Sequence, residues 1–420
     1  MELLIRAAEI IQPNSSLHKK TKDILVADGI IKSIEDKIDF SGNTVFSDNL
    51  KLSTGWLDMR ANYNDPGFEH KEDLFSGTHL ARASGFTDIV LTPNTSPVVS
   101  NKNAISYYLR YNKTAYTTLH PIAAMTERCE GIELTEMIDL DANGAVAFSD
   151  GVNSIWRTDV FIKGLEYLQK FNGLLIDKPQ DKLLTSFGQM HEGEVSTYLG
   201  MTGISTLSET LAIHRNLELL KYAGGKLHFS LVSTREGLEL IKGAKAAGLD
   251  VTCDVGANYL LFEDRQLEKY DTTLKVNPPY RLKEDREALI DGVLDGSIDM
   301  IVSDHNPQDV ESKKLEFDLA EFGSSNQQTF YSVVLKALGN DYESVIDAFT
   351  ITPRKRLGLQ LPVIQEGEEA CFTLFDPTLS WIFDEKTNKS KSEASPFFGQ
   401  EMKGKVIGTV NKGYFHLNEY

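Results

Sequence analysis

The sequence predicts an α/β fold: a large (β/α)8 barrel, with a small β-sandwich domain formed by both termini. Two observations predict it. Short apolar, β-branched runs alternate with segments of helical spacing through the middle of the chain, and both ends instead show strands and tight turns. A chain of 420 residues is also long enough for a large barrel or for two domains.

Eight strand candidates lie in the middle of the chain, which is the number of strands in a (β/α)8 barrel. These candidates are residues 57–63, 87–93, 118–125, 144–150, 173–178, 226–232, 250–256 and 299–304. Helical spacing separates them and is clearest in residues 71–85, 103–112, 158–171, 207–224 and 234–248. We therefore predict a barrel domain over residues 55–362.

Both ends of the chain depart from this alternation. Residues 1–54 include LLIRAAEII and DILVADGIIKSIE, whose Asp-Gly pair is a hairpin signal. From about residue 363 the pattern returns in EACFTLFDP and GKVIGTVNKGYFHL. We predict that residues 1–54 and 363–420 form one composite β domain.

Composition and charge restrict the kinds of partner. A formal net charge of −18 argues against nucleic acid or an anionic membrane as the partner. Cys129, Cys253 and Cys371 lie far apart and form no Cys-x-x-Cys motif, so a disulfide framework is not expected and a reducing compartment fits. No apolar run approaches the ~18 residues of a membrane-spanning helix. We expect a soluble, cytoplasmic protein.

In a parallel barrel, functional side chains lie where the strands run out into loops at the carboxyl end. The residues at these places are Arg60, Asn62 and Asn64 after the first strand, Asn94 after the second, Asp150 after the fourth, Lys178 after the fifth, Leu231 after the sixth, and Asp304 and His305 after the eighth.

Several segments carry a more specific signal. They are DPGFEHKEDLFSGTHLARASGFTDIVLTPNTSPV (65–98), GAVAFSD (144–150), HEGEVSTYLGMTGI (191–204), KVNPPYRLKEDREALIDGVLDGSID (275–299), VSDHNP (302–307) and PFFGQEMKGKV (396–406). With these segments the chain resembles the amidohydrolase superfamily, and within it the dihydroorotases of pyrimidine biosynthesis. The resemblance covers nearly the whole chain. It implies a barrel of the metal-dependent hydrolase type.

The resemblance also implies a metal site whose ligands are mostly replaced here. Arg60 and Asn62 stand where the family has His-x-His, and Lys178 and Leu231 stand where it has two further histidines. Two carboxylates of the family's metal-site pattern remain, Asp150 and Asp304, although Gly151 follows Asp150 where a second aspartate is usual. We interpret Asp304, at the family's general-base position, as vestigial.

The substrate positions that the resemblance implies are partly kept. Asn94 and Asn277 remain, whereas Asn64 replaces an arginine that grips the substrate carboxylate and Gln308 replaces a substrate-contacting histidine. His305 follows Asp304 directly, so it either lines the pocket or is a structural residue. We predict a pocket formed by these five positions.

A zinc site needs roughly three or four ligands with free lone pairs. Leucine has none, and the cations of arginine and lysine repel a metal ion. We therefore expect no metal cofactor, although two carboxylates could hold a weak cation such as Mg²⁺. We expect Arg60 to pair with Asp304 in a forked geometry, Lys178 to approach Asp150, and Leu231 to pack.

Two classes of function remain open. In the first, the chain is a non-catalytic dihydroorotase homologue, a homodimer that acts as a structural or regulatory partner of aspartate carbamoyltransferase, as the resemblance implies for inactive members. In the alternative, it is an active dihydroorotase or a related cyclic-amide hydrolase with an atypical metal site, which would require zinc. We favour the first because of the replaced histidines.

Overall fold

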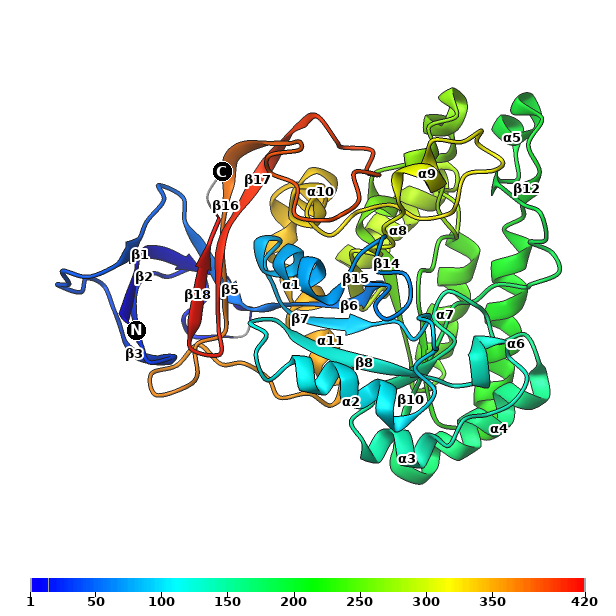
Figure 1. Ribbon diagram of the computed structural model, residues 1–420, viewed down its shortest axis with the longest axis horizontal. Coiled ribbons are helices and arrows are strands. Elements are labelled where there is room, and N and C mark those ends of the chain that lie inside the picture. Colours follow the sequence, from blue (N-terminus) through cyan, green and yellow to red (C-terminus); the bar gives the residue numbers. More distant parts are fainter. Residues whose placement is uncertain (1, 14, 419–420) are drawn as a thin grey trace.

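Parallel strands form the centre of the protein, which a computed structural model describes over residues 2–13 and 15–418 (Figure 1). Over those residues the barrel sheet contains eight strands. They are β6 (Trp56–Ala61), β7 (Phe86–Leu91), β8 (Thr118–Ala124), β9 (Ala147–Ser149), β10 (Leu174–Asp177), β13 (Lys226–Phe229), β14 (Val251–Gly256) and β15 (Met300–Val302). Each coincides with a predicted strand, and the strands neighbour one another in chain order.

The sheet closes where its first and last strands meet. Ala61, the last residue of β6, forms a parallel bridge with His305, and the amide of Asn62 donates to the carbonyl of His305 at 2.8 Å. Apolar side chains from the strands fill the interior, among them Leu57, Val90 and Ile176. The predicted (β/α)8 barrel is confirmed.

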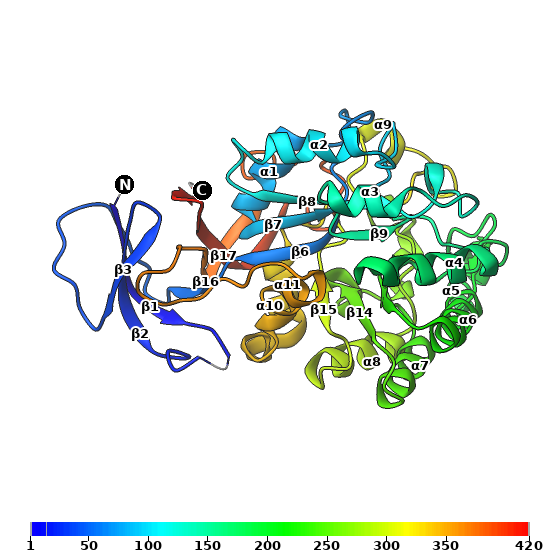
Figure 2. The ribbon, with the colours of Figure 1, turned by 90° about the horizontal axis from the view of Figure 1, so that it is seen from below.

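Helices cover the outside of the barrel (Figure 2). They include α1 (Leu74–Ala83), α2 (Lys102–Tyr111), α3 (Met137–Ala142), α4 (Thr158–Leu168), α6 (Leu207–Ala223), α7 (Arg235–Ala246), α8 (Lys283–Leu294), α10 (Phe330–Leu338) and α11 (Thr352–Leu357). Their starts follow from the sequence: Asp73 accepts from the Ser76 amide before α1, and Thr234 accepts from the Gly237 amide before α7. Among the described residues, no helix has the length and apolar character needed to cross a bilayer.

Both termini contribute to one connected sheet beside the barrel (Figure 1). Its strands are β1 (Glu2–Ile10), β2 (Thr21–Ala27), β3 (Ile30–Glu35), β4 (Thr44–Val45), β5 (Lys51–Thr54), β16 (Phe372–Phe383), β17 (Gln400–Asn411) and β18 (Tyr414–Leu417). The two ends join where β5 pairs with β16 in antiparallel register, Leu52 opposite Leu374. The composite unit from the two termini is confirmed, whereas the domain boundaries at residues 54 and 363 stay a prediction.

The segment between β16 and β17 links this terminal sheet to the loops of the barrel. Ser390 donates to Glu72, Lys391 pairs with Asp73, and the Ser392 hydroxyl donates to the carbonyl of Gln308 at 2.6 Å. We call residues 384–399 the strap. The strap fixes the loops that follow β6 and β15, where predicted site residues lie.

Candidate functional site

A cavity of about 410 Å³ opens at the carboxyl ends of the barrel strands. The structure brings most of the predicted site residues together around it. Those that line the cavity are Arg60, Asn62, Asn64, Asn94, Lys178, Asn277, Asp304 and Gln308. The position agrees with the rule that parallel barrels place functional side chains at this end.

Arg60 and Asp304 form a buried ion pair at the floor of this cavity. Arg60 Nε lies 3.1 Å from Asp304 Oδ1, and the two residues are 4 % and 7 % exposed. The predicted pairing is confirmed, but it is a single contact and not a fork. Burial raises the pKa of Asp304 to about 6, and the Arg60 guanidinium opposes that rise.

The other end of the Arg60 guanidinium contacts a series of buried, hydrogen-bonded side chains that the sequence analysis did not identify. Arg60 Nη1 donates to Ser230 Oγ at 3.4 Å and to the Gly151 carbonyl at 3.5 Å. Ser230 donates to Asp254 at 3.0 Å, and Asp254 lies 2.9 Å from His228 Nε2. His228 is thus a buried, hydrogen-bonded residue of the barrel layer. The signal for Asp254 was its place near the end of the seventh strand.

Lys178 directly follows β10 and is only 4 % exposed. Its ammonium donates to the carbonyl of Val152 at 3.4 Å. Burial lowers the pKa of Lys178 to about 7, and the nearby Arg60 adds to that effect. The prediction that Lys178 approaches Asp150 as its partner is wrong, because local groups have taken the carboxylate of Asp150.

Asp150 is turned away from the cavity. Its carboxylate accepts hydrogen bonds from the Thr126 amide at 2.9 Å, the Thr126 hydroxyl and the Gly131 amide at 3.1 Å. Burial raises its pKa to about 6, and these hydrogen bonds oppose the rise. The loop after β8 therefore satisfies the carboxylate that the family resemblance assigns to a metal.

Leu231 and His305 also lie outside the cavity. Leu231 packs with the apolar interior of the barrel, as predicted, and its amide donates to Asp254 at 2.6 Å. His305 is fully buried, with Nδ1 accepting from the Asn326 amide and Nε2 lying 3.5 Å from Glu72. The expectation that His305 lines the pocket is not met, because its ring points toward α1 and the strap.

Amide side chains form much of the cavity wall, and most of them are held by neighbours. Asn62 donates to the His305 carbonyl and accepts from Thr92, while Asn94 bridges the Asp150 carbonyl and the Val152 amide. Asn64 differs: its Nδ2 is buried without a hydrogen-bond partner among the described residues. The wall therefore presents an uncharged amide with a spare donor at this point.

The remaining wall contains a cation that sequence reasoning did not single out. Lys71 donates to Gln308 Oε1 at 2.7 Å, and Gln308 donates in turn to the Phe322 carbonyl at 2.9 Å. Asn277 accepts from Gln180 at 2.9 Å. Lys71 lies in the loop after the first strand, and a search of all loops at this end of the barrel would have found it.

The side chains at the mouth of the barrel do not provide the ligands that a zinc ion needs. Arg60 occupies one oxygen of Asp304, backbone and hydroxyl donors occupy Asp150, and Leu231 offers no lone pair. Across residues 2–13 and 15–418, no three His, Cys, Asp or Glu side chains come together in a way that could hold a metal ion. Arg60 with Asp304, Lys178 and Leu231 thus form an ion pair, an ammonium without an ion pair and an apolar contact.

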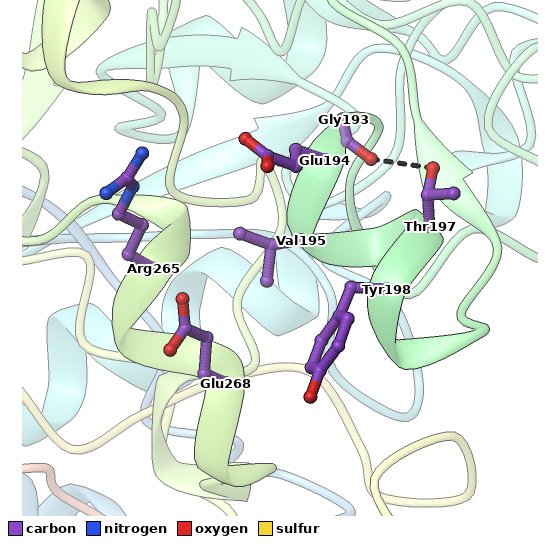
Figure 3. Close-up of a pocket in the computed structure, with 7 residues that line it drawn as sticks. All are labelled: Gly193, Glu194, Val195, Thr197, Tyr198, Arg265 and Glu268. Carbon is purple, nitrogen blue, oxygen red and sulfur yellow. Dashed lines mark hydrogen bonds between the residues drawn. The ribbon is translucent and has the colours of Figure 1, made fainter.

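A larger hollow of about 660 Å³ lies elsewhere, between α5 (Glu194–Leu199) and the turn of 3-10 helix at Asp264–Lys269 (Figure 3). Its charged side chains, Glu194, Arg265 and Glu268, are exposed, and Tyr198 is 84 % exposed. The only hydrogen bond that Figure 3 marks among the labelled residues is the one from Thr197 to the Gly193 carbonyl. This hollow lacks converging buried polar groups, so the barrel mouth is the candidate site.

Comparisons with known proteins agree with this geometry. A family model described as dihydro-orotase-like matches residues 51–237, and one described as the amidohydrolase family matches residues 209–414. A protein named dihydroorotase from Citrifermentans bemidjiense is 34 % identical, over 98 % of this chain and 99 % of its own. Another of that name, from Acetivibrio thermocellus, is 34 % identical over 99 % of both chains.

Solved structures show the same fold at lower identity. An L-hydantoinase (dihydropyrimidinase) from Arthrobacter aurescens superposes with a TM-score of 0.84 at 20 % identity, over 99 % of this chain and 97 % of its own. A dihydropyrimidinase from Brevibacillus agri gives 0.80 at 18 % identity, over 100 % and 95 %. The architecture and the full-length similarity lead to one conclusion: this chain belongs to the dihydroorotase family of amidohydrolases.

Proposed function

We propose that this chain is a dihydroorotase-family protein that does not carry out metal-dependent hydrolysis. The observation that supports this is the Arg60–Asp304 ion pair at the floor of the mouth. A metal-bound water supplies hydroxide near neutral pH in hydrolases of this type. Here a guanidinium holds the carboxylate that the family pattern gives to the metal and to the general base.

Elemental analysis of protein purified without chelator tests this proposal. We expect far less than one zinc per chain and no hydrolysis of dihydroorotate above background. About two tightly held metal ions per chain, together with turnover, would refute the proposal. The same preparation should be assayed in both directions of the reaction, because a slow enzyme can be missed in one direction.

A matched variant sharpens the test. Arg60→His, Asn62→His, Lys178→His and Leu231→His together restore the histidines of the family pattern. We expect this variant to gain zinc affinity more readily than activity, since Asn64 and Gln308 still replace the substrate-gripping side chains. Activity restored to the level of an ordinary dihydroorotase would mean that these two positions are not limiting.

The alternative is an active dihydroorotase, or a related cyclic-amide hydrolase, with an atypical metal site. The names of the full-length relatives favour it, since the proteins from Citrifermentans bemidjiense and Acetivibrio thermocellus are both called dihydroorotase. The metal and turnover measurements above separate the two proposals, because the alternative requires both a bound metal and hydrolysis.

For the non-catalytic protein we propose a structural or regulatory role with aspartate carbamoyltransferase, and a homodimer by the general preference for two-fold symmetry. Support comes from the family resemblance and from the retained barrel. Size-exclusion chromatography of the two proteins mixed at micromolar concentration should give a joint peak, and this chain alone should elute at twice the mass of one chain. Independent elution with unchanged carbamoyltransferase kinetics would remove this partner.

A further inference from the structure

Lys178 holds a buried ammonium that has no ion pair with any described residue. It lines the mouth cavity, is 4 % exposed and makes one long hydrogen bond, to the Val152 carbonyl at 3.4 Å. An ammonium can donate three hydrogen bonds, and buried charges in proteins are normally paired. The other two N–H groups of the Lys178 ammonium therefore need a hydrogen-bond acceptor.

The carboxylates around Lys178 are engaged elsewhere. Asp304 accepts from Arg60, and Asp150 accepts from Thr126 and Gly131. Asp177, the residue before Lys178, accepts from Asn216 Nδ2 at 2.7 Å and from the Ile155 amide at 3.3 Å. Asp304 Oδ2 has no donor among the described residues, yet no described carboxylate lies within ion-pair distance of the Lys178 ammonium.

Arg60 faces the same cavity with unused donors. Its Nε binds Asp304, and its Nη1 makes only the two long contacts of 3.4 and 3.5 Å. Its Nη2 makes no hydrogen bond to any residue that the structure describes. Two cationic groups with spare N–H donors thus line one cavity, and only Arg60 is paired with a carboxylate.

The charges around the cavity set the class of ligand. With Lys178 protonated, three cations line it, Arg60, Lys71 and Lys178, against two carboxylates, Asp304 and Glu321, which leaves one positive charge. A monoanion balances that charge, whereas a dianion leaves an excess negative charge beside Asp304. Guanidinium and ammonium groups donate well to the oxygens of a carboxylate.

We infer that the mouth cavity binds a small monocarboxylate through the Lys178 ammonium and the free edge of the Arg60 guanidinium. The ligand's carboxylate lies at the place where the family pattern puts its metals, so the inference rests on the proposed metal-free function. A volume of about 410 Å³ leaves room for a small organic acid. The amide side chains of the wall face the rest of that molecule.

Titration calorimetry with the full-length protein tests this inference, with acetate as the probe and acetamide as its uncharged isostere. The protein is first dialysed into chloride-free, carboxylate-free buffer at constant ionic strength. We expect saturable binding of one acetate per chain, no binding of acetamide, and at least tenfold weaker binding of malonate and inorganic phosphate. The absence of saturable acetate binding overturns the inference.

Two variants locate the site. Lys178→Met should weaken acetate binding at least tenfold, and Lys178→Arg, which keeps the charge, should retain most of it. The matched control is Lys163→Met, because Lys163 lies on α4 with its side chain 66 % exposed. Equal acetate affinity in Lys178→Met and the wild type overturns the inference, and circular dichroism of each variant verifies the fold.

The metal content and dihydroorotate turnover of the same sample separate this inference from the proposed function. A metal-free, inactive protein without acetate binding refutes the carboxylate site alone. A protein with two metals and turnover refutes the proposed function, and the carboxylate site with it.

Discussion

Two arginine–aspartate pairs, one half-buried and one buried, lie at opposite ends of the barrel strands, and they differ in the number of their partners. At the amino ends, Asp88 accepts from Arg354, from His120 at 2.8 Å and from Thr87 at 2.8 Å. Arg354 also donates to the carbonyls of Gly55 and Thr350, at 2.7 and 2.6 Å. At the mouth, Asp304 has only one contact with Arg60.

The pKa values of the two carboxyls follow this difference. Burial acts to raise the pKa of Asp88, but Arg354 and His120 hold it well below its usual range. Burial prevails at Asp304, whose pKa rises to about 6. A carboxylate that accepts from several donors stays charged in the protein interior and stabilises the fold. A buried carboxylate with a single donor is more easily protonated, and its cationic partner keeps N–H groups that can bind other ligands.

The largest effect is expected at the amino ends. Arg354→Ala should lower the free energy of unfolding by about 4 to 5 kcal/mol, near the top of the range for breaking a buried pair, because it also leaves two carbonyls without a donor. Urea unfolding followed by circular dichroism measures it. The control is Arg157→Ala, whose exposed pair with Asp159 should contribute little to stability. A loss as small as the control's would remove the contrast between the two pairs.

Arg60→Ala should have the second-largest effect, about 3 kcal/mol at pH 8. The loss should be smaller at pH 5, because Asp304 then takes up a proton and no longer leaves a bare charge in the interior. Arg60→Ala with Asp304→Asn should recover part of the loss at pH 8. The same loss at both pH values would contradict the assignment of the proton to Asp304.

Lys178→Met should stabilise the protein, by about 2 kcal/mol at pH 6.5 in carboxylate-free buffer. Burial lowers the pKa of Lys178 to about 7 from 10.5, so the folded protein releases a proton that the unfolded chain keeps. The free energy of unfolding of the wild type therefore rises between about pH 7 and 10. The difference in stability between Lys178→Met and the wild type should accordingly be smaller at pH 9. Melting temperatures at both pH values measure this, and a destabilised variant at pH 6.5 would speak against a buried, unpaired ammonium.

The smallest effect is expected for Asp150→Asn. Burial raises the folded pKa of Asp150 to about 6 from 3.8, so the stability that this group contributes is present below 3.8 and is lost as the pH rises through 6. Relative to the wild type, the variant should gain roughly 1 to 2 kcal/mol between pH 4.5 and pH 7.5. A relative loss over this range would show that the three hydrogen bonds to Asp150 outweigh its burial.

The sequence predicts the barrel well because buried parallel strands are continuous apolar runs, which stand out between helical segments. It does not predict the two-stranded insertion after β10, because β11 (Met190–His191) and β12 (Gly203–Ile204) are too short to show an alternating apolar pattern. Of the side-chain pairings, Arg60 with Asp304 follows from adjacent strands. Lys178 with Asp150 fails, since the loop that contains Gly131 donates to the carboxylate of Asp150, a contact that strand order does not reveal.

The pairing of β5 with β16 has a consequence for the order in which the chain is made. About 318 residues separate Thr54 from Phe372. At a synthesis rate of roughly 5–20 residues per second, β16 is therefore made some 16 to 64 s after β5. During that interval the backbone N–H and C=O groups of β5 remain open to pairing with another nascent chain. The assembly of this protein on the ribosome therefore depends on protecting one short strand until the last part of the chain emerges.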